Sequence, residues 1–162
     1  MQIKFLLAIL LLSLSSISYA DDNSDDSWLS YDHLVLNAGA YTHFGDDPEY
    51  DGKPILVSLE AHKSNDWLYG LALFDNSFGQ FSQYAYVAKL WRFSDTKDGF
   101  YGKLSGGFIH GYKDEYEDKI PLNSLGVAPA IIPGVGYKKG RYGTELVLFG
   151  TAGVLWTFGL DL

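Results

Sequence analysis

Two parts of the chain carry side chains that could take part in acyl transfer. His43 supplies an imidazole, and Asp75, Asn76 and Ser77 supply a carboxylate, an amide and a hydroxyl at consecutive positions. A base, a hydroxyl and a group that orients the base are the parts that acyl transfer requires. Asp, Asn and Ser also form turns by bonding to nearby backbone groups, so residues 75–77 alone are first interpreted as an Asx turn.

The elements that must position these residues are predicted to be β-strands. Turn-forming residues divide residues 28–162 into eight segments, most of them about 8 to 12 residues long, the length of a tilted strand that spans a bilayer. We therefore predict an all-β fold, an eight-stranded antiparallel transmembrane β-barrel of the outer-membrane type. The longer connections, such as residues 111–124, are expected to face the cell exterior, with His43 pointing inward at that rim.

The start of the chain is predicted to be a cleaved signal peptide, residues 1–20. Lys4 precedes an apolar run, and small and polar residues lead to Ala20, which is the pattern of an export signal. An acidic segment, residues 21–27, then precedes the barrel, residues 28–162. We expect a monomer in the bacterial outer membrane, inserted by the barrel assembly machinery.

Composition limits the possible partners. The formal net charge is −8, and without a basic patch nucleic-acid binding is not expected. The chain has no cysteine, which excludes disulfides and thiol chemistry. No metal ion or other cofactor is expected.

Alternation of side chains assigns residues to the lumen. The periplasmic half is predicted to hold Glu60, Lys89, Lys103 and Glu145, whose charges should pair, while Tyr84 and Tyr86 of the fourth strand are predicted to face lipid. Small and apolar residues in the upper half predict a narrow, dry cavity that suits a hydrocarbon chain. The predicted acyl-chain cavity residues are Tyr41, Ala72, Phe74, Phe81, Ala85, Val87, Gly107, Ile109 and Phe149.

Two structural alternatives remain open at this point. The interior of a small barrel is usually filled by its own side chains, which would leave no cavity. A soluble barrel of the lipocalin type also has strands of alternating polarity.

Several stretches between Tyr41 and Leu162 resemble the PagP-type lipid A palmitoyltransferases. The segment 50–54, Tyr-Asp-Gly-Lys-Pro, is similar to the family's Tyr-Asn-Glu-Arg-Pro. Residues 67–77 resemble a Gly-Leu-Tyr stretch that runs through Phe into an Asp-Ser pair. Residues 119–122, Lys-Ile-Pro-Leu, are similar to the family's Tyr-Ile-Pro-Leu region, which a proline-interrupted strand follows.

The resemblance implies an enzyme that moves a palmitoyl-type acyl chain from a glycerophospholipid donor to lipid A at the extracellular surface. It assigns a catalytic role to Ser77, while the family's Asp falls on Asn76, with Asp75 before it. The family's His falls nearest Tyr41, and His43 lies two residues further on the same strand face. In the family, prolines mark gaps that admit lipid sideways, which implies lateral access at Pro54, Pro121, Pro129 and Pro133.

Two other functions are compatible with the same sequence. A non-enzymatic structural or surface-interaction barrel would use the acidic segment 113–118 to bridge divalent cations or neighbouring lipopolysaccharide. A lipid A deacylase would use water at the same rim.

Overall fold

The computed structural model describes residues 30–45, 55–123, 125–150 and 152–162. Residues 31–162 form one compact unit. The predicted signal peptide, residues 1–20, and the acidic segment, residues 21–27, lie outside the described residues. Within the described ranges, no helix is both long and apolar enough to cross a membrane.

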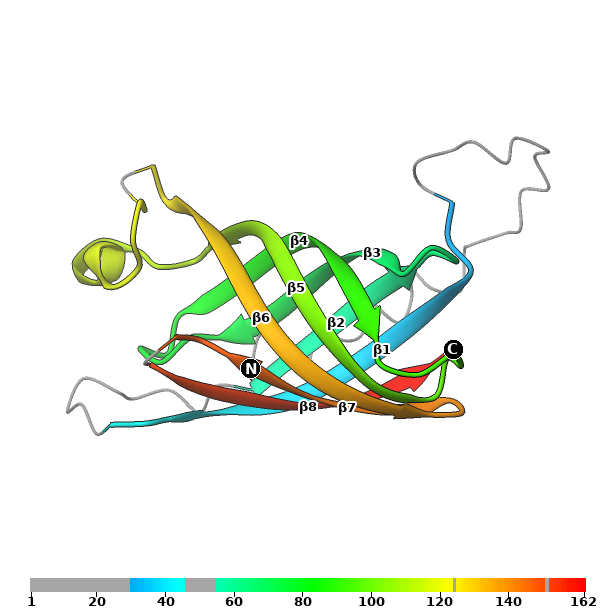
Figure 1. The fold of residues 1–162 in the computed structure, drawn as a ribbon. Helices are drawn as coiled ribbons and strands as arrows, with labels where there is room; N and C mark the ends of the chain where they lie inside the picture. The colour runs from blue at the N-terminus through cyan, green and yellow to red at the C-terminus, as the bar shows by residue number, and fades with distance from the viewer. Residues whose placement is uncertain (1–29, 46–54, 124, 151) are drawn as a thin grey trace. The chain divides into compact units, whose positions relative to one another are not determined.

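Eight antiparallel strands close into a barrel, in which each strand pairs with its neighbours in sequence and β8 pairs with β1 (Figure 1). This confirms the predicted all-β, eight-stranded architecture. The strands are β1 (His33–His43), β2 (Ile55–His62), β3 (Trp67–Asp75), β4 (Phe81–Arg92), β5 (Gly99–His110), β6 (Val127–Lys139), β7 (Tyr142–Leu148) and β8 (Gly153–Asp161).

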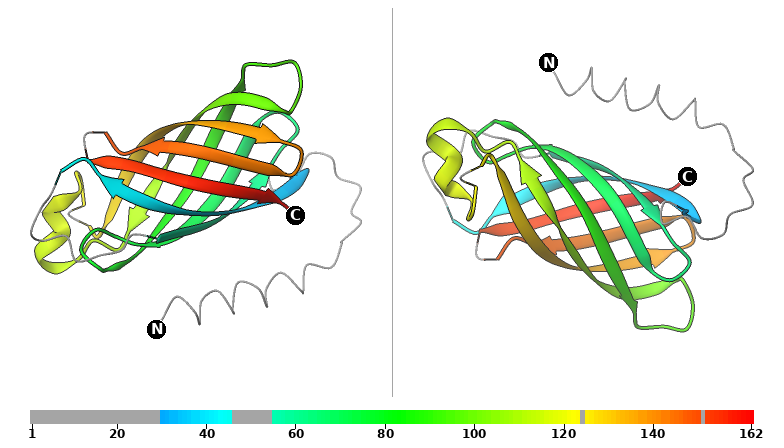
Figure 2. Two further views of the ribbon diagram at one scale, coloured as in Figure 1. Left: turned by 90° about the horizontal axis from the view of Figure 1, so that it is seen from below. Right: turned by 90° about the horizontal axis from the view of Figure 1, so that it is seen from above.

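The connections lie alternately at the two ends of the barrel. We call the end with the β1–β2, β3–β4, β5–β6 and β7–β8 connections the rim, and the opposite end the turn end. A short 3-10 helix, η1 (Asp114–Lys119), belongs to the β5–β6 connection. Figures 1 and 2 show η1 and the β3–β4 turn at the same end of the barrel, and the carboxyl terminus at the other.

The outer face of the strands is apolar. A soluble monomer rarely exposes large apolar side chains on most of its strands, so the lipocalin-type alternative does not fit and the barrel is of the membrane-spanning type. The exposed large apolar side chains on this face include Trp67, Leu71, Val87, Phe100, Leu104, Phe108, Ile131, Val135, Leu146, Trp156 and Phe158.

Strand β4 faces the opposite way from the prediction. Ser82 and Tyr84 are buried, whereas Gln83 is exposed, so the side chains at even positions point into the lumen. The prediction of three cavity residues is therefore wrong, because the outer face of β4 carries Phe81, Ala85 and Val87.

The register of the β3–β4 hairpin gives the reason. Asp75 pairs with Phe81, and directly paired residues of an antiparallel ladder lie on the same face of the sheet. Asp75 shares the outer face of β3 with Leu71, so Phe81 and every second residue after it face outward. Lys89 accordingly lies outside the lumen, where its Nζ donates to the Asn65 carbonyl.

Gly70 creates the space into which the Tyr86 ring fits. A Cβ at position 70 would lie 2.7 Å from Tyr86 Cζ, and the Tyr86 hydroxyl donates to Glu60 Oε1 at 2.7 Å. We predict that Gly70→Ala destabilises the barrel by about 1–3 kcal/mol, because the ring must move and its hydrogen bond is lost.

Urea titration of the protein in lipid vesicles, followed by tryptophan fluorescence, measures this loss. Gly106→Ala is the matched control, since a Cβ at position 106 would have no atom of the described residues within 4 Å. Equal midpoints for the two variants would contradict the packing argument.

Candidate functional site

Ser77 lies in a three-residue hairpin turn between β3 and β4. The Asn76 N–H donates to the Gln80 carbonyl at 2.9 Å, and the Gly79 N–H donates to the Asn76 carbonyl at 3.0 Å. Gly79 has a φ of 74°, a left-handed conformation that glycine adopts without strain. A hydrogen-bonded turn that ends in a left-handed glycine is typical of three-residue hairpin loops.

The Asn76 side chain holds this turn together. Its Oδ1 accepts hydrogen bonds from the Phe78 and Gln80 N–H groups, both at 3.0 Å, and the residue is 2% exposed. Residues 76–80 thus contain the Asx turn that the sequence alone favoured. The backbone at Ser77 is fixed by this arrangement.

His43 is the last residue of β1, and the Tyr41 ring packs against it. The Tyr41 ring meets the His43 imidazole edge-on, with centroids 4.6 Å apart, and meets Phe149 at 5.3 Å. Gly153 gives the Tyr41 ring its place, because a Cβ there would lie 2.6 Å from Tyr41 Cζ. The imidazole is therefore held by packing as well as by the strand.

The structure brings His43 and Ser77 together across the rim. His43 Nε2 lies 2.6 Å from Ser77 Oγ, and both side chains are partly buried. With the proton on Nδ1, Nε2 accepts the hydrogen bond of the serine hydroxyl, which is the geometry that a base and its nucleophile need. The catalytic role of the pair stays a prediction, but its geometry suits that role.

Asp75 and Asn76 do not orient His43 in this arrangement. Asn76 Oδ1 is occupied by the turn, and Asp75 belongs to the outer face of β3, paired with Phe81. The Asp75 side chain makes no hydrogen bond or ion pair with another described residue. The predicted orienting group is thus not supplied by either residue in the part of the chain that the structure describes.

The lumen contains a cavity of about 50 Å³ between an apolar layer and a charged layer. Of the predicted cavity residues, Ala72 and Phe149 line it, while Phe74 and Ile109 pack in the adjacent apolar cluster. Tyr41 and Gly107 share the inward faces of β1 and β5 but do not line it. A cavity of this size is well below the roughly 300–1,000 Å³ of ligand pockets.

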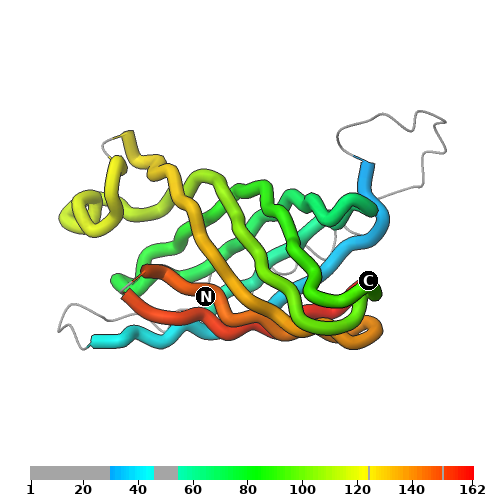
Figure 3. Tube along the Cα trace, viewed as in Figure 1, coloured from blue at the N-terminus to red at the C-terminus, as the bar shows by residue number. Residues whose placement is uncertain are grey.

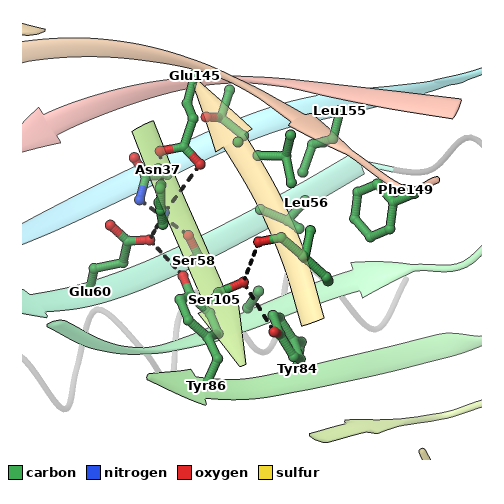
Figure 4. Close-up of a pocket in the computed structure, with 16 residues that line it drawn as sticks. Asn37, Leu56, Ser58, Glu60, Tyr84, Tyr86, Ser105, Glu145, Phe149 and Leu155 are labelled. Carbon is green, nitrogen blue, oxygen red and sulfur yellow. Dashed lines mark hydrogen bonds and ion pairs between the residues drawn. The ribbon is translucent and has the colours of Figure 1, made fainter. Parts of the chain in front are cut away.

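Charged side chains form the floor of this cavity, as the sequence predicts for Glu60, Lys103 and Glu145. Lys103 Nζ lies 2.6 Å from Glu60 Oε1 and 3.2 Å from Glu145 Oε1. Tyr86, which the sequence pattern placed outside, adds its hydroxyl to the Glu60 carboxylate. Figure 4 shows Glu60, Tyr86 and Glu145 pointing into the same pocket. The charges below the rim are therefore paired with one another across the lumen.

The β6–β7 seam is open at the rim. Strand β6 pairs with β7 from Gly134 to Lys139, whereas among the described strands residues 127–133 pair only with β5. Pro129 and Pro133 lie in this segment, and since proline donates no N–H to a ladder, it suits a strand edge without a partner. Pro121 lies in the β5–β6 connection rather than in a strand, and Pro54 lies outside the described residues.

We searched the described residues for side-chain clusters that could bind a metal ion. No group of three or more His, Asp or Glu side chains within the described ranges is placed to hold a metal ion.

Comparison with known proteins gives little beyond the fold. No protein-family model matches the chain, and no curated protein matches it. Among solved structures it is similar to the outer membrane protein Ail of Yersinia pestis in a phospholipid bilayer nanodisc, with 13% identity over 80% of this chain and 99% of that chain and a TM-score of 0.45. It is also similar to a protein of unknown function from Clostridium acetobutylicum, with 14% identity over 82% and 97% of the two chains and a TM-score of 0.19. Neither likeness bears on the activity of this chain.

Proposed function

We propose that the protein is an outer-membrane acyltransferase that moves a fatty acyl chain from a glycerophospholipid to lipid A. The observation that carries this proposal is the 2.6 Å contact between His43 Nε2 and Ser77 Oγ at the rim. The rim is proposed to face the cell exterior, because the longer loops of such barrels lie outside. The phospholipid donor and the lipid A acceptor would then meet the His43–Ser77 dyad in the outer leaflet.

In the proposed reaction, His43 takes the proton of the Ser77 hydroxyl while Ser77 Oγ attacks the ester carbonyl carbon of the phospholipid. The bond from that carbon to the glycerol oxygen breaks, and the glycerol oxygen receives the proton from His43. A hydroxyl of lipid A then gives its proton to His43 and attacks the acyl-serine. The lipid A ester leaves, and the proton returns to Ser77.

The open β6–β7 seam supports access of lipid from the side. Ile132 and Gly134 of β6 and Val147 of β7 line the cavity next to the point where the two strands part. From there, Phe149 contacts Tyr41, and Tyr41 contacts His43. A donor acyl chain would enter at Pro129 and Pro133 and lie largely along the seam, since the enclosed space is small.

The experiment is expression in a bacterium whose lipid A lacks the extra chain, followed by mass spectrometry of lipid A and phospholipids. Acyl transfer predicts a lipid A species with one added acyl chain, together with lysophospholipid. Loss of an acyl chain with release of free fatty acid would instead identify a deacylase. Unchanged lipids in cells that display the folded barrel would refute the enzymatic proposal.

A second candidate function is a non-enzymatic structural or surface-interaction barrel. The observation that favours it is the small interior cavity of about 50 Å³, because a barrel filled by its own side chains has no need to admit a ligand. In that case the acidic residues of η1 would act through divalent cations at the surface.

A further inference from the structure

The β5–β6 connection lies against the turn that carries Ser77. Figure 3 shows this connection leaving the end of β5 and folding back toward β6. The Gln80 side-chain amide bonds twice to the backbone of Lys113, with Nε2 donating to the carbonyl at 3.2 Å and Oε1 accepting from the N–H at 3.1 Å. Both bonds join residues that are 33 positions apart, so they tie the turn to a separate loop.

A second contact joins the same loop to the residue after Ser77. The Phe78 ring stacks on the Tyr116 ring of η1, with centroids 4.3 Å apart and planes at 13°, and meets Tyr112 edge-on at 6.3 Å. Lys119 Nζ lies 5.5 Å from the centroid of the Phe78 ring. The loop therefore contacts the turn on both sides of Gly79, at Phe78 and at Gln80.

The loop is itself braced, which makes it a firm support. Asn123 is 4% exposed, and its Nδ2 donates to the Tyr112 carbonyl at 2.9 Å and to the Glu117 carbonyl at 3.2 Å. These two bonds fix the beginning of the connection and η1 to the segment that returns to β6.

We propose that the β5–β6 connection positions Ser77 toward His43, with Gln80 and Tyr116 as the positioning residues. This inference rests on the proposed function for its effect on the reaction, although its effect on the geometry does not. Displacement of a reacting group by about 1 Å costs roughly 10²-fold in rate. A turn that could shift would therefore lower the rate at which Ser77 attacks the ester.

The geometric test uses the whole barrel in detergent micelles with ¹⁵N-labelled histidine. The His43 Nε2 resonance, assigned by its loss in His43→Gln, reports on the bond to Ser77, and Ser77→Ala gives its value without that bond. We expect Gln80→Leu and Tyr116→Ala to move the resonance toward the Ser77→Ala value. Tyr116→Phe keeps the stacked ring and should stay at the wild-type position.

The control is Gln83→Leu, which makes the same change on the exposed outer face of β4. It should leave the His43 resonance in place. A resonance that is unmoved in both Gln80→Leu and Tyr116→Ala overturns the inference, whether or not the wild type acts on lipids.

The kinetic test follows acyl transfer between phospholipid and lipid A in vesicles. Gln80→Leu is expected to lower kcat about 5- to 30-fold with little change in KM, and to add nothing to the loss in Ser77→Ala, because residues that act as a unit are not additive. An inactive wild type would refute the proposed function and leave the NMR result to decide the positioning role. An active wild type with unchanged kcat in Gln80→Leu would refute the positioning role alone.

Discussion

Lipid A acylation is expected to fall by about 10²- to 10⁴-fold when His43 is replaced by Gln, because the reaction then lacks its general base. Ser77→Ala should cause a loss of similar size, since the hydroxyl 2.6 Å from His43 Nε2 is the nucleophile in the proposed reaction. The double variant should be no worse than either single variant, because the two side chains act as one unit. Initial rates in lipid vesicles measure all three.

Matched controls are available for both substitutions. His110 is exposed on the outer face of β5, and Ser64 is exposed in the β2–β3 turn at the opposite end of the barrel. His110→Gln and Ser64→Ala should therefore keep wild-type rates. Acylation that persists in His43→Gln and Ser77→Ala would remove the dyad from the mechanism, even if the protein proved to be an acyltransferase.

The second large effect is expected from Lys103→Met. Lys103 pairs with two carboxylates, those of Glu60 and Glu145, and both glutamates are buried. Removing the cation leaves Glu145 without its counter-ion and Glu60 with His62 alone, at 2.9 Å. The loss of one partner of a buried ion pair costs about 3–5 kcal/mol. The midpoint of urea unfolding in lipid vesicles should fall accordingly.

Two further variants separate this cause from a general loss of packing. Lys89→Met removes the same charge from the outside of the barrel and should cost less than about 1 kcal/mol. Adding Glu60→Gln and Glu145→Gln to Lys103→Met should recover much of the stability, because no uncompensated charge then remains. A triple variant as unstable as the single one would show that the shape of the lysine side chain, rather than its charge, matters.

Strand number and most strand faces could be predicted from the sequence, because alternation is a local property. Asn37 and Glu145 point inward, and Trp156 points outward, as their neighbours in sequence indicate. The facing of β4 was predicted wrongly because its inward residues, Tyr84 and Tyr86, are of the aromatic type that is common on lipid-facing surfaces. Their hydroxyls bond to Ser105 and Glu60 in the lumen, so each ring packs while its polar end is satisfied.

A signal for the correct facing of β4 was present in the chain. The segment 75–79, Asp-Asn-Ser-Phe-Gly, matches a three-residue hairpin turn with glycine in the left-handed position. Counting residues across that turn pairs Asp75 with Phe81 and sets every later residue of β4. Gly70 is a second signal, because a glycine opposite Tyr86 leaves room for an inward ring.

The meeting of His43 and Ser77 at the rim could be predicted from the sequence, but the contacts that support Ser77 could not. His43 and Ser77 could be proposed because residue type and strand position are enough to suggest them. The contribution of Gln80 and Tyr116 could not, because it depends on where the β5–β6 connection folds, and no periodic pattern encodes that contact. The cavity volume likewise depends on how whole side chains fill the lumen.

The unpaired edge of β6 also bears on how copies of this protein meet in a crowded membrane. A bare strand edge is a template for strand addition by a neighbouring chain, and residues 127–133 form such an edge on the β7 side. Pro129 and Pro133 have no N–H group to donate, so a strand that added to this edge would lack one backbone hydrogen bond at each proline. Pro129 and Pro133, which suit an unpaired edge at the seam, therefore also disfavour edge-to-edge pairing of two barrels.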